Sequence, residues 1–154
     1  MNCTFFGHRD VSDAIKGDLE ESILSLIETE RIELFLVGNN GNFDFLVQEV
    51  LAGLKREGKD VRFRIVLSRL DEKALSMNQK ETVFPEELEN TIPKFAISKR
   101  NEWLIKNASV LIAFVKHRPS SSAVWVERAA RRGLAVRNIA KDRNAAPRTF
   151  SKKS

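Results

Sequence analysis

The feature that most constrains the fold is a short apolar run followed by a glycine-rich turn. Residues 34–37 are four consecutive apolar residues, which predicts a strand buried on both faces. The next five are of types that tolerate tight turns and positive φ: Gly38, Asn39, Asn40, Gly41 and Asn42. Apolar residues then recur with helical spacing: Phe43, Leu46, Val47, Val50, Leu51 and Leu54.

A strand, a glycine turn and a helix together place free backbone N–H groups at a helix N-terminus, which suits an anion such as phosphate. Neither the dinucleotide spacing G-x-G-x-x-G nor the P-loop pattern with its lysine is present. A plain strand-to-helix turn that needs glycines is therefore the alternative interpretation.

The same alternation of strand and helix continues along the chain. Further strands are predicted at residues 3–6, 61–67, 110–115 and 134–139. Further helices are predicted at residues 12–30, 95–107 and 121–132. The strand at 61–67 alternates apolar and polar residues, which indicates an edge position. With right-handed crossovers, this pattern predicts an α/β fold: a doubly wound parallel sheet of about five strands in the order 3-2-1-4-5, with helices on both faces.

We expect residues 1–140 to form one Rossmann-like domain, with an irregular insertion at 68–93 that contains a helical turn at 86–89. Residues 141–154 are expected to be a basic, disordered tail. They hold five basic residues and one acidic residue, so only +1 of the net charge of +5 belongs to residues 1–140. That balance argues against a basic face for nucleic acid, leaving weak binding through the tail as an alternative.

Other features exclude whole classes of protein. No run reaches the roughly 18 apolar residues of a membrane span, and the N-terminus lacks the pattern of a signal peptide. One cysteine cannot form an internal disulfide, so a cytoplasmic location is expected. Two histidines and one cysteine lack metal-ligand spacing, so neither a metal site nor a cofactor is predicted.

In a doubly wound sheet the ligand lies beyond the carboxyl ends of the strands, where the winding reverses. Three polar turns are predicted to meet there. They contribute Gly7, His8 and Arg9, then the glycine turn at 38–42, and then Ser120, Ser121 and Ser122. The first turn would contact a phosphate or ribose, and the serines would hold a phosphate at a helix start. The alternatives are a polar helix entry and an ordinary N-cap.

Arg100 and Asn101 lie on the helix that leads into the fourth strand. If that helix crosses the carboxyl edge of the sheet, Arg100 faces the ligand. The alternative is an exposed arginine on a charged helix.

Residues 3–9, 35–44, 83–85 and 93–103 together resemble a small bacterial family of the SLOG superfamily of Rossmann-like, nucleotide-binding domains. That superfamily includes the "lonely guy" phosphoribohydrolases, often labelled lysine decarboxylases, and the DNA-processing protein A fold. The resemblance covers most of residues 2–139. It implies a homodimer and a ligand derived from a nucleotide.

The resemblance also implies roles for individual residues. Arg100 matches the arginine before strand 4 of the phosphoribohydrolases, and Glu127 matches their catalytic glutamate. Residues 120–122 occupy the place of their glycine-rich phosphate loop, but serine Cβ atoms restrict the approach of a phosphate to the backbone. We therefore predict a sensor domain that binds a nucleotide-derived ligand with little or no hydrolysis. An N-glycosidase that uses Arg100 and Glu127 is one alternative, and weak nucleic-acid binding is another.

Overall fold

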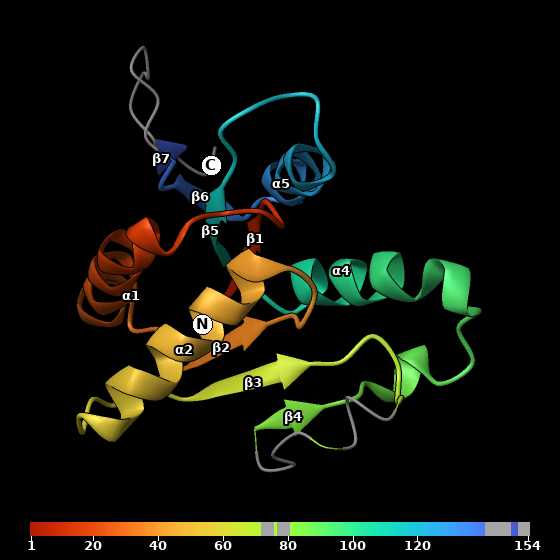
Figure 1. Ribbon diagram of the computed structural model, residues 1–154, viewed down its shortest axis with the longest axis horizontal. Helices are drawn as coiled ribbons and strands as arrows, with labels where there is room; N and C mark the ends of the chain where they lie inside the picture. Colours follow the sequence, from red (N-terminus) through yellow and green to blue (C-terminus); the bar gives the residue numbers. More distant parts are fainter. Residues whose placement is uncertain (72–75, 77–80, 141–148, 151–154) are drawn as a thin grey trace.

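The computed structural model describes residues 1–71, 76, 81–140 and 149–150, which form one sheet between two layers of helices (Figure 1). The strands are β1 (Asn2–Gly7), β2 (Leu34–Val37), β3 (Phe63–Val66), β4 (Thr82–Val83), β5 (Val110–Phe114), β6 (Ala135–Asn138) and β7 (Thr149–Phe150). They lie in the order β4-β3-β2-β1-β5-β6-β7. All pairs are parallel except β6 with β7, which is antiparallel.

The predicted order of the five main strands is confirmed, because β3-β2-β1-β5-β6 forms the middle of the sheet. The predicted edge position of the strand at 61–67 is wrong, since β4 from the expected insertion pairs with β3. Arg64 explains the misleading pattern. It is the one exposed residue of β3, whose other residues, Phe63, Ile65 and Val66, are buried.

The main helices are α1 (Lys16–Glu30), α2 (Asn42–Arg56), α4 (Ala96–Lys106) and α5 (Ser121–Arg131), with short 3-10 turns η1 (Asp13–Ile15), η2 (Glu86–Leu88) and η3 (Pro93–Phe95). Two separate apolar cores follow from this arrangement. Residues such as Phe5 and Phe35 pack against α1 and α2 on one face of the sheet. Phe6 and Leu36 pack against α4 and α5 on the other. Neighbouring residues of each strand point to opposite faces, so every central strand is buried on both.

Local signals set the helix ends as expected. Gly58 and Gly133 follow α2 and α5 with positive φ, as C′ glycines do. The Ser12 side chain caps η1 by accepting a hydrogen bond from the Ala14 N–H. Within the described part of the chain, no helix is long and apolar enough to cross a bilayer.

The sequence-predicted insertion and tail are only partly covered by the structure. Residues 72–75 and 77–80 of the insertion lie outside the described residues, as do 141–148 and 151–154 of the tail. The described part of the insertion contains β4 and, at η2, the expected helical turn. Within the expected tail, residues 149–150 form β7.

Candidate functional site

A small cleft of about 180 Å³ lies at the carboxyl edge of the sheet, beside the point where the strand order reverses between β1 and β5. Eight of the residues predicted for the site line it: Gly7, Arg9, Gly38, Asn40, Arg100, Asn101, Ser121 and Ser122. Asp44, Ile97, Leu104 and Trp125 also contribute, together with Phe5 and Phe6 of β1. The predicted convergence of three turns and one helix on this edge is thus found in the structure.

Arg100 is a buried cation that lines the cleft. Its side chain is buried, and the residue is only 3% exposed, because α4 crosses the carboxyl edge. Its Nε donates to Asn101 Oδ1 at 3.1 Å, while Nη1 donates to Asn39 Oδ1 at 3.2 Å and to the Val66 carbonyl at 3.4 Å. None of these bonds uses Nη2. The interpretation of Arg100 as an exposed residue of a charged helix is therefore wrong.

Asp44, in the first turn of α2, is the carboxylate that faces Arg100. Its Oδ2 accepts the Asn40 N–H at 2.9 Å. Removal from water raises the pKa of Asp44 to about 6, although Arg100, the Asn40 N–H and Arg9 each act to lower it. Burial also lowers the pKa of Arg100, and the nearby Asp44 partly offsets that effect. The cleft therefore holds two cations, Arg9 and Arg100, and one carboxylate that titrates near neutral pH.

Two glycines are required by the packing around this pair. A Cβ at Gly38 would lie 2.7 Å from Arg100 Nη1 and 2.8 Å from Asp44 Oδ2. Gly41 has a φ of 98° at the N-cap of α2, and a Cβ there would lie 3.1 Å from the Arg9 backbone. The glycine turn thus has a packing reason that is independent of any ligand, and it also brings the backbone close to both cations of the cleft.

The three serines occupy two kinds of position, one at the N-cap of α5 and two in the lining of the cleft. Ser120 is the N-cap of α5, and its Oγ accepts the Ala123 N–H at 3.1 Å. It does not line the cleft, whereas Ser121 and Ser122 do. N–H groups in the first turn of a helix have no partner within the helix, so this turn offers donors to an anion.

His8 does not take part in the cleft. It is 6% exposed, and its Nε2 accepts the Lys116 N–H at 2.8 Å. Its ring stacks on that of His117, with centroids 4.1 Å apart. Burial and His117 lower the pKa of His8, so the neutral ring that this bond requires is favoured. His8 was predicted to contact a phosphate or ribose. In the structure its Nε2 instead forms a hydrogen bond that links β1 to the loop after β5.

Two other predicted residues, Asn39 and Asn42, form hydrogen bonds beside the cleft without lining it. Asn39 holds Arg100 through its side-chain oxygen. Asn42 donates from its side chain to the Val11 carbonyl and from its backbone to the Arg9 carbonyl. These contacts fix the turn that follows β2 against the turn that follows β1.

Glu127 is not brought together with Arg100. It is exposed on α5, where its Oε1 accepts a charged hydrogen bond from Arg118 Nη1, and it does not line the cleft. Asp44 is the cleft carboxylate that sequence reasoning missed. The sequence does contain a signal that Asp44 is buried. Asp44 precedes the buried Val47 by three residues and the buried Leu51 by seven, so all three lie on the same side of the helix. Among the described residues, no group of three or more potential ligands could hold a metal.

Comparison with solved structures identifies the fold. DNA processing protein A from Streptococcus pneumoniae superposes with a TM-score of 0.66 at 19% identity over 92% of this chain. A structure of the Helicobacter pylori protein that addresses its single-stranded DNA binding mode gives 0.65 at 13% identity over 96%. The chain spans 50% and 68% of those two proteins. No protein-family model and no curated protein matches the sequence. The likeness establishes a Rossmann-like fold similar to that of the DNA processing proteins.

Proposed function

We propose that this chain binds single-stranded nucleic acid and holds one backbone phosphate in the cleft at the carboxyl edge. The observation that carries the proposal is the donor set of the cleft. Arg9, Arg100 and the first turn of α5 border the same space. Guanidinium groups and helix N-termini are common ligands of phosphate.

The size of the cleft favours part of a polymer over an enclosed small molecule. Pockets for drug-sized ligands have volumes of about 300–1,000 Å³, and this cleft has about 180 Å³. A phosphate with its sugar fits such a space, and the attached bases would extend outside it. The sequence predicted nucleic-acid binding only as an alternative. The size of the cleft gives it more support than the binding of a small nucleotide-derived molecule by a sensor domain. The single-stranded DNA binding addressed for the Helicobacter pylori neighbour points the same way.

Binding without hydrolysis fits the placement of the carboxylates. Glycosidic hydrolysis requires a carboxylate near the reacting carbon to stabilise its charge or activate water. Glu127 pairs with Arg118 away from the cleft. Asp44 is held beneath the glycine turn by the Asn40 N–H. The predicted pair of Arg100 and Glu127 is therefore not assembled at the cleft, and Asp44, the carboxylate that does line it, already accepts a backbone N–H.

Fluorescence anisotropy of a labelled ten-nucleotide oligo(dT) at about 50 mM salt tests the proposal. Arg9→Ala should weaken binding about tenfold, since a hydrogen bond to a charged group contributes about 1.5 kcal/mol or more. Arg62→Ala is the matched control, because Arg62 is also exposed but precedes β3 at the opposite edge of the sheet.

Two results would count against the proposal. One is the absence of any anisotropy change at protein concentrations of roughly 100 μM, where even non-specific binding is detectable. The other is displacement of the oligonucleotide by micromolar thymidine monophosphate. That result would support the hypothesis of a sensor domain for a small nucleotide-derived ligand, since a free nucleotide would then occupy the cleft as well as the polymer does.

A further inference from the structure

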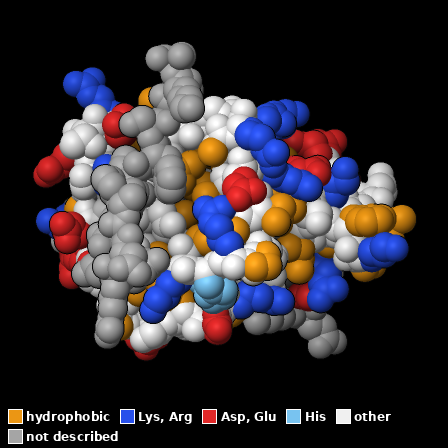
Figure 2. Space-filling model, turned by 90° about the horizontal axis from the view of Figure 1, so that it is seen from above, with side chains coloured by type: hydrophobic (Ala, Val, Ile, Leu, Met, Phe, Trp, Pro, Cys, Tyr) orange, Lys and Arg blue, Asp and Glu red, His pale blue; other side chains and the backbone are white. Residues whose placement is uncertain are grey.

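A second hollow, of about 560 Å³, crosses the outer face of α4 from η2 on one side to α5 on the other. We call it the α4 hollow. Figure 2, which shows the molecule from above, has Lys and Arg side chains beside hydrophobic ones on that face. Its lining consists of Glu87, Leu88, Lys99, Glu102, Trp103, Ile105, Lys106, Trp125, Arg128, Arg131 and Arg132.

The charge of the α4 hollow is strongly positive for a chain whose folded part is nearly neutral. Five cations line it against two carboxylates. Glu102 pairs with Lys99, and Glu87 accepts the Trp103 indole N–H at 2.8 Å. The other cations, Lys106, Arg128, Arg131 and Arg132, form no ion pair with a described carboxylate. The hollow therefore has unbalanced positive charge available for an anionic partner.

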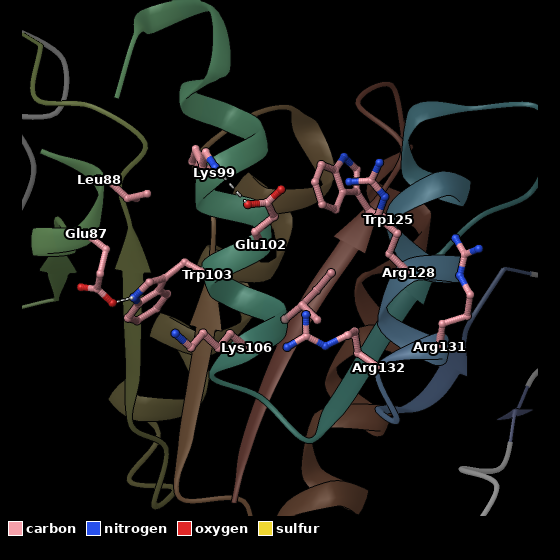
Figure 3. A pocket seen from close by; sticks show the side chains of 11 residues that line it. Glu87, Leu88, Lys99, Glu102, Trp103, Lys106, Trp125, Arg128, Arg131 and Arg132 are labelled. Atoms are coloured by element: carbon pink, nitrogen blue, oxygen red, sulfur yellow. Dashed lines mark hydrogen bonds and ion pairs between the residues drawn. The ribbon is translucent and has the colours of Figure 1, made fainter. Parts of the chain in front are cut away.

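Both tryptophans of the chain line the same hollow. Figure 3 shows Trp103 and Trp125 on opposite sides of α4, with Trp103 beside Glu87 and Trp125 beside Arg128. The Arg128 guanidinium lies 4.7 Å from the centre of the Trp125 ring. Both indoles are only partly buried. Large aromatic side chains that stay partly exposed beside cations are the combination that binds single strands by stacking and phosphate contact.

Helix electrostatics explains part of this pattern but not all of it. Lys106, Arg128 and Arg131 lie in the last turns of α4 and α5, where cations offset the helix dipole. The dipole does not require two partly exposed indoles, and it does not require that they border one continuous hollow with those cations.

Trp125 also lines the cleft at the carboxyl edge, so the two cavities are adjacent. A helix is about 10 Å wide with its side chains, and a stacked strand rises about 3.4 Å per nucleotide. Roughly three nucleotides therefore bridge the two sides of α4. We infer that the α4 hollow is a second nucleic-acid subsite, in which a strand leaving the cleft stacks bases on Trp125 and then Trp103, with its phosphates near Lys106 and Arg132.

This inference rests on the proposed function, and tryptophan fluorescence separates the two. The chain has two tryptophans and no tyrosine, so Trp125→Phe leaves Trp103 as the single strong reporter, and Trp103→Phe leaves Trp125. Ten-nucleotide oligo(dT) should quench both single-tryptophan proteins. The dinucleotide should quench Trp125 alone, since it is too short to cross α4. Trp103→Ala should weaken binding of the ten-mer about tenfold, as loss of one stacked base does.

Salt dependence tests the charges. The double variant Lys106→Ala/Arg132→Ala should lower the slope of log K against log salt by about 1.4, because each phosphate contact on a single strand contributes about 0.7. Lys59→Ala/Arg62→Ala removes two exposed cations from the connection between α2 and β3 and is the matched control. It should leave the slope unchanged.

The outcomes are distinct. If the ten-mer binds but Trp103 is not quenched and the double variant behaves as wild type, the α4 hollow is not a subsite and the proposed function stands. If no oligonucleotide binds, the proposed function fails as well. If a ten-residue oligoglutamate quenches Trp103 with equal affinity, the hollow binds acidic chains by charge alone, and the assignment of base stacking is overturned.

Discussion

Replacement of Asp44 by asparagine tests which force sets the charge state of the cleft. An unperturbed aspartate has a pKa of 3.8, and burial raises the pKa of Asp44 to about 6 against the opposing effects of Arg100, the Asn40 N–H and Arg9. The difference corresponds to about 3 kcal/mol, at about 1.36 kcal/mol for each pH unit. Desolvation therefore outweighs the combined effect of Arg100, the Asn40 N–H and Arg9 by about that amount.

The sign of the effect on stability follows from proton linkage. The folded protein binds the Asp44 proton more tightly than the unfolded chain does, so this contribution is complete below pH 3.8 and is lost as the pH rises through about 6. The Asp44→Asn variant has no such proton to bind. The free energy of unfolding of the wild type, minus that of Asp44→Asn, should therefore fall by about 3 kcal/mol between about pH 3.5 and about pH 7.

Urea denaturation of both proteins at half-unit pH intervals measures this difference. Asp60→Asn, which removes an exposed carboxylate before β3, controls for the loss of one surface charge. A difference that rises with pH would mean that Arg100 and Arg9 dominate and that Asp44 is a conventional ion-pair partner. A difference that stays flat would mean that Asp44 is well solvated. Either result refutes the reasoning.

Further predictions concern single residues near the cleft and one glycine in α1. Gly38→Ala should lower the free energy of unfolding by about 1–3 kcal/mol, because its Cβ would lie 2.7 Å from a buried guanidinium nitrogen. Gly17→Ala, where a Cβ meets open space in α1, should instead raise it by about 0.5–1 kcal/mol in the same urea titrations. In an NMR titration, His8 should titrate below pH 6.5, and the variant His117→Gln assigns the two histidine signals. The contribution of the neutral His8 ring to stability should be lost as the pH falls. Titration of His8 above pH 6.5 would contradict the buried neutral ring. Ser120→Ala should cost about 1 kcal/mol through loss of the α5 N-cap, and an unchanged midpoint in urea would show that the cap is dispensable.

The net charge of the chain does not describe how charge is distributed over its surface. Averaged over residues 1–140, the balance is +1, which argued against nucleic acid. Folding places five cations of α4, of α5 and of the cap that follows α5 around one hollow that has only two carboxylates. The net charge summed over the sequence does not reveal this clustering of cations, because the clustering depends on which helix faces are adjacent in space.

Periodicity by itself determined the architecture. The buried runs, the helical spacing of residues 43–54 and the punctuating glycines are local signals, and right-handed crossovers leave few ways to assemble them. The same rules located the carboxyl edge and most of the residues that line its cleft. The pairing of β4 with β3 was missed, because a strand of two residues has no period to detect.

Only the tertiary structure decided what each polar side chain does. Arg100 and Glu127 looked alike in the sequence, as charged residues on amphipathic helices. Arg100 is buried against Asn39, whereas Glu127 is exposed and held by Arg118. His8 and Arg9 are neighbours in the chain, yet one joins β1 to the loop after β5 and the other borders the cleft. The pattern of a sequence determines which face of an element is apolar, but the partners and the pKa of a polar group depend on distances of a few ångströms between segments far apart in the chain.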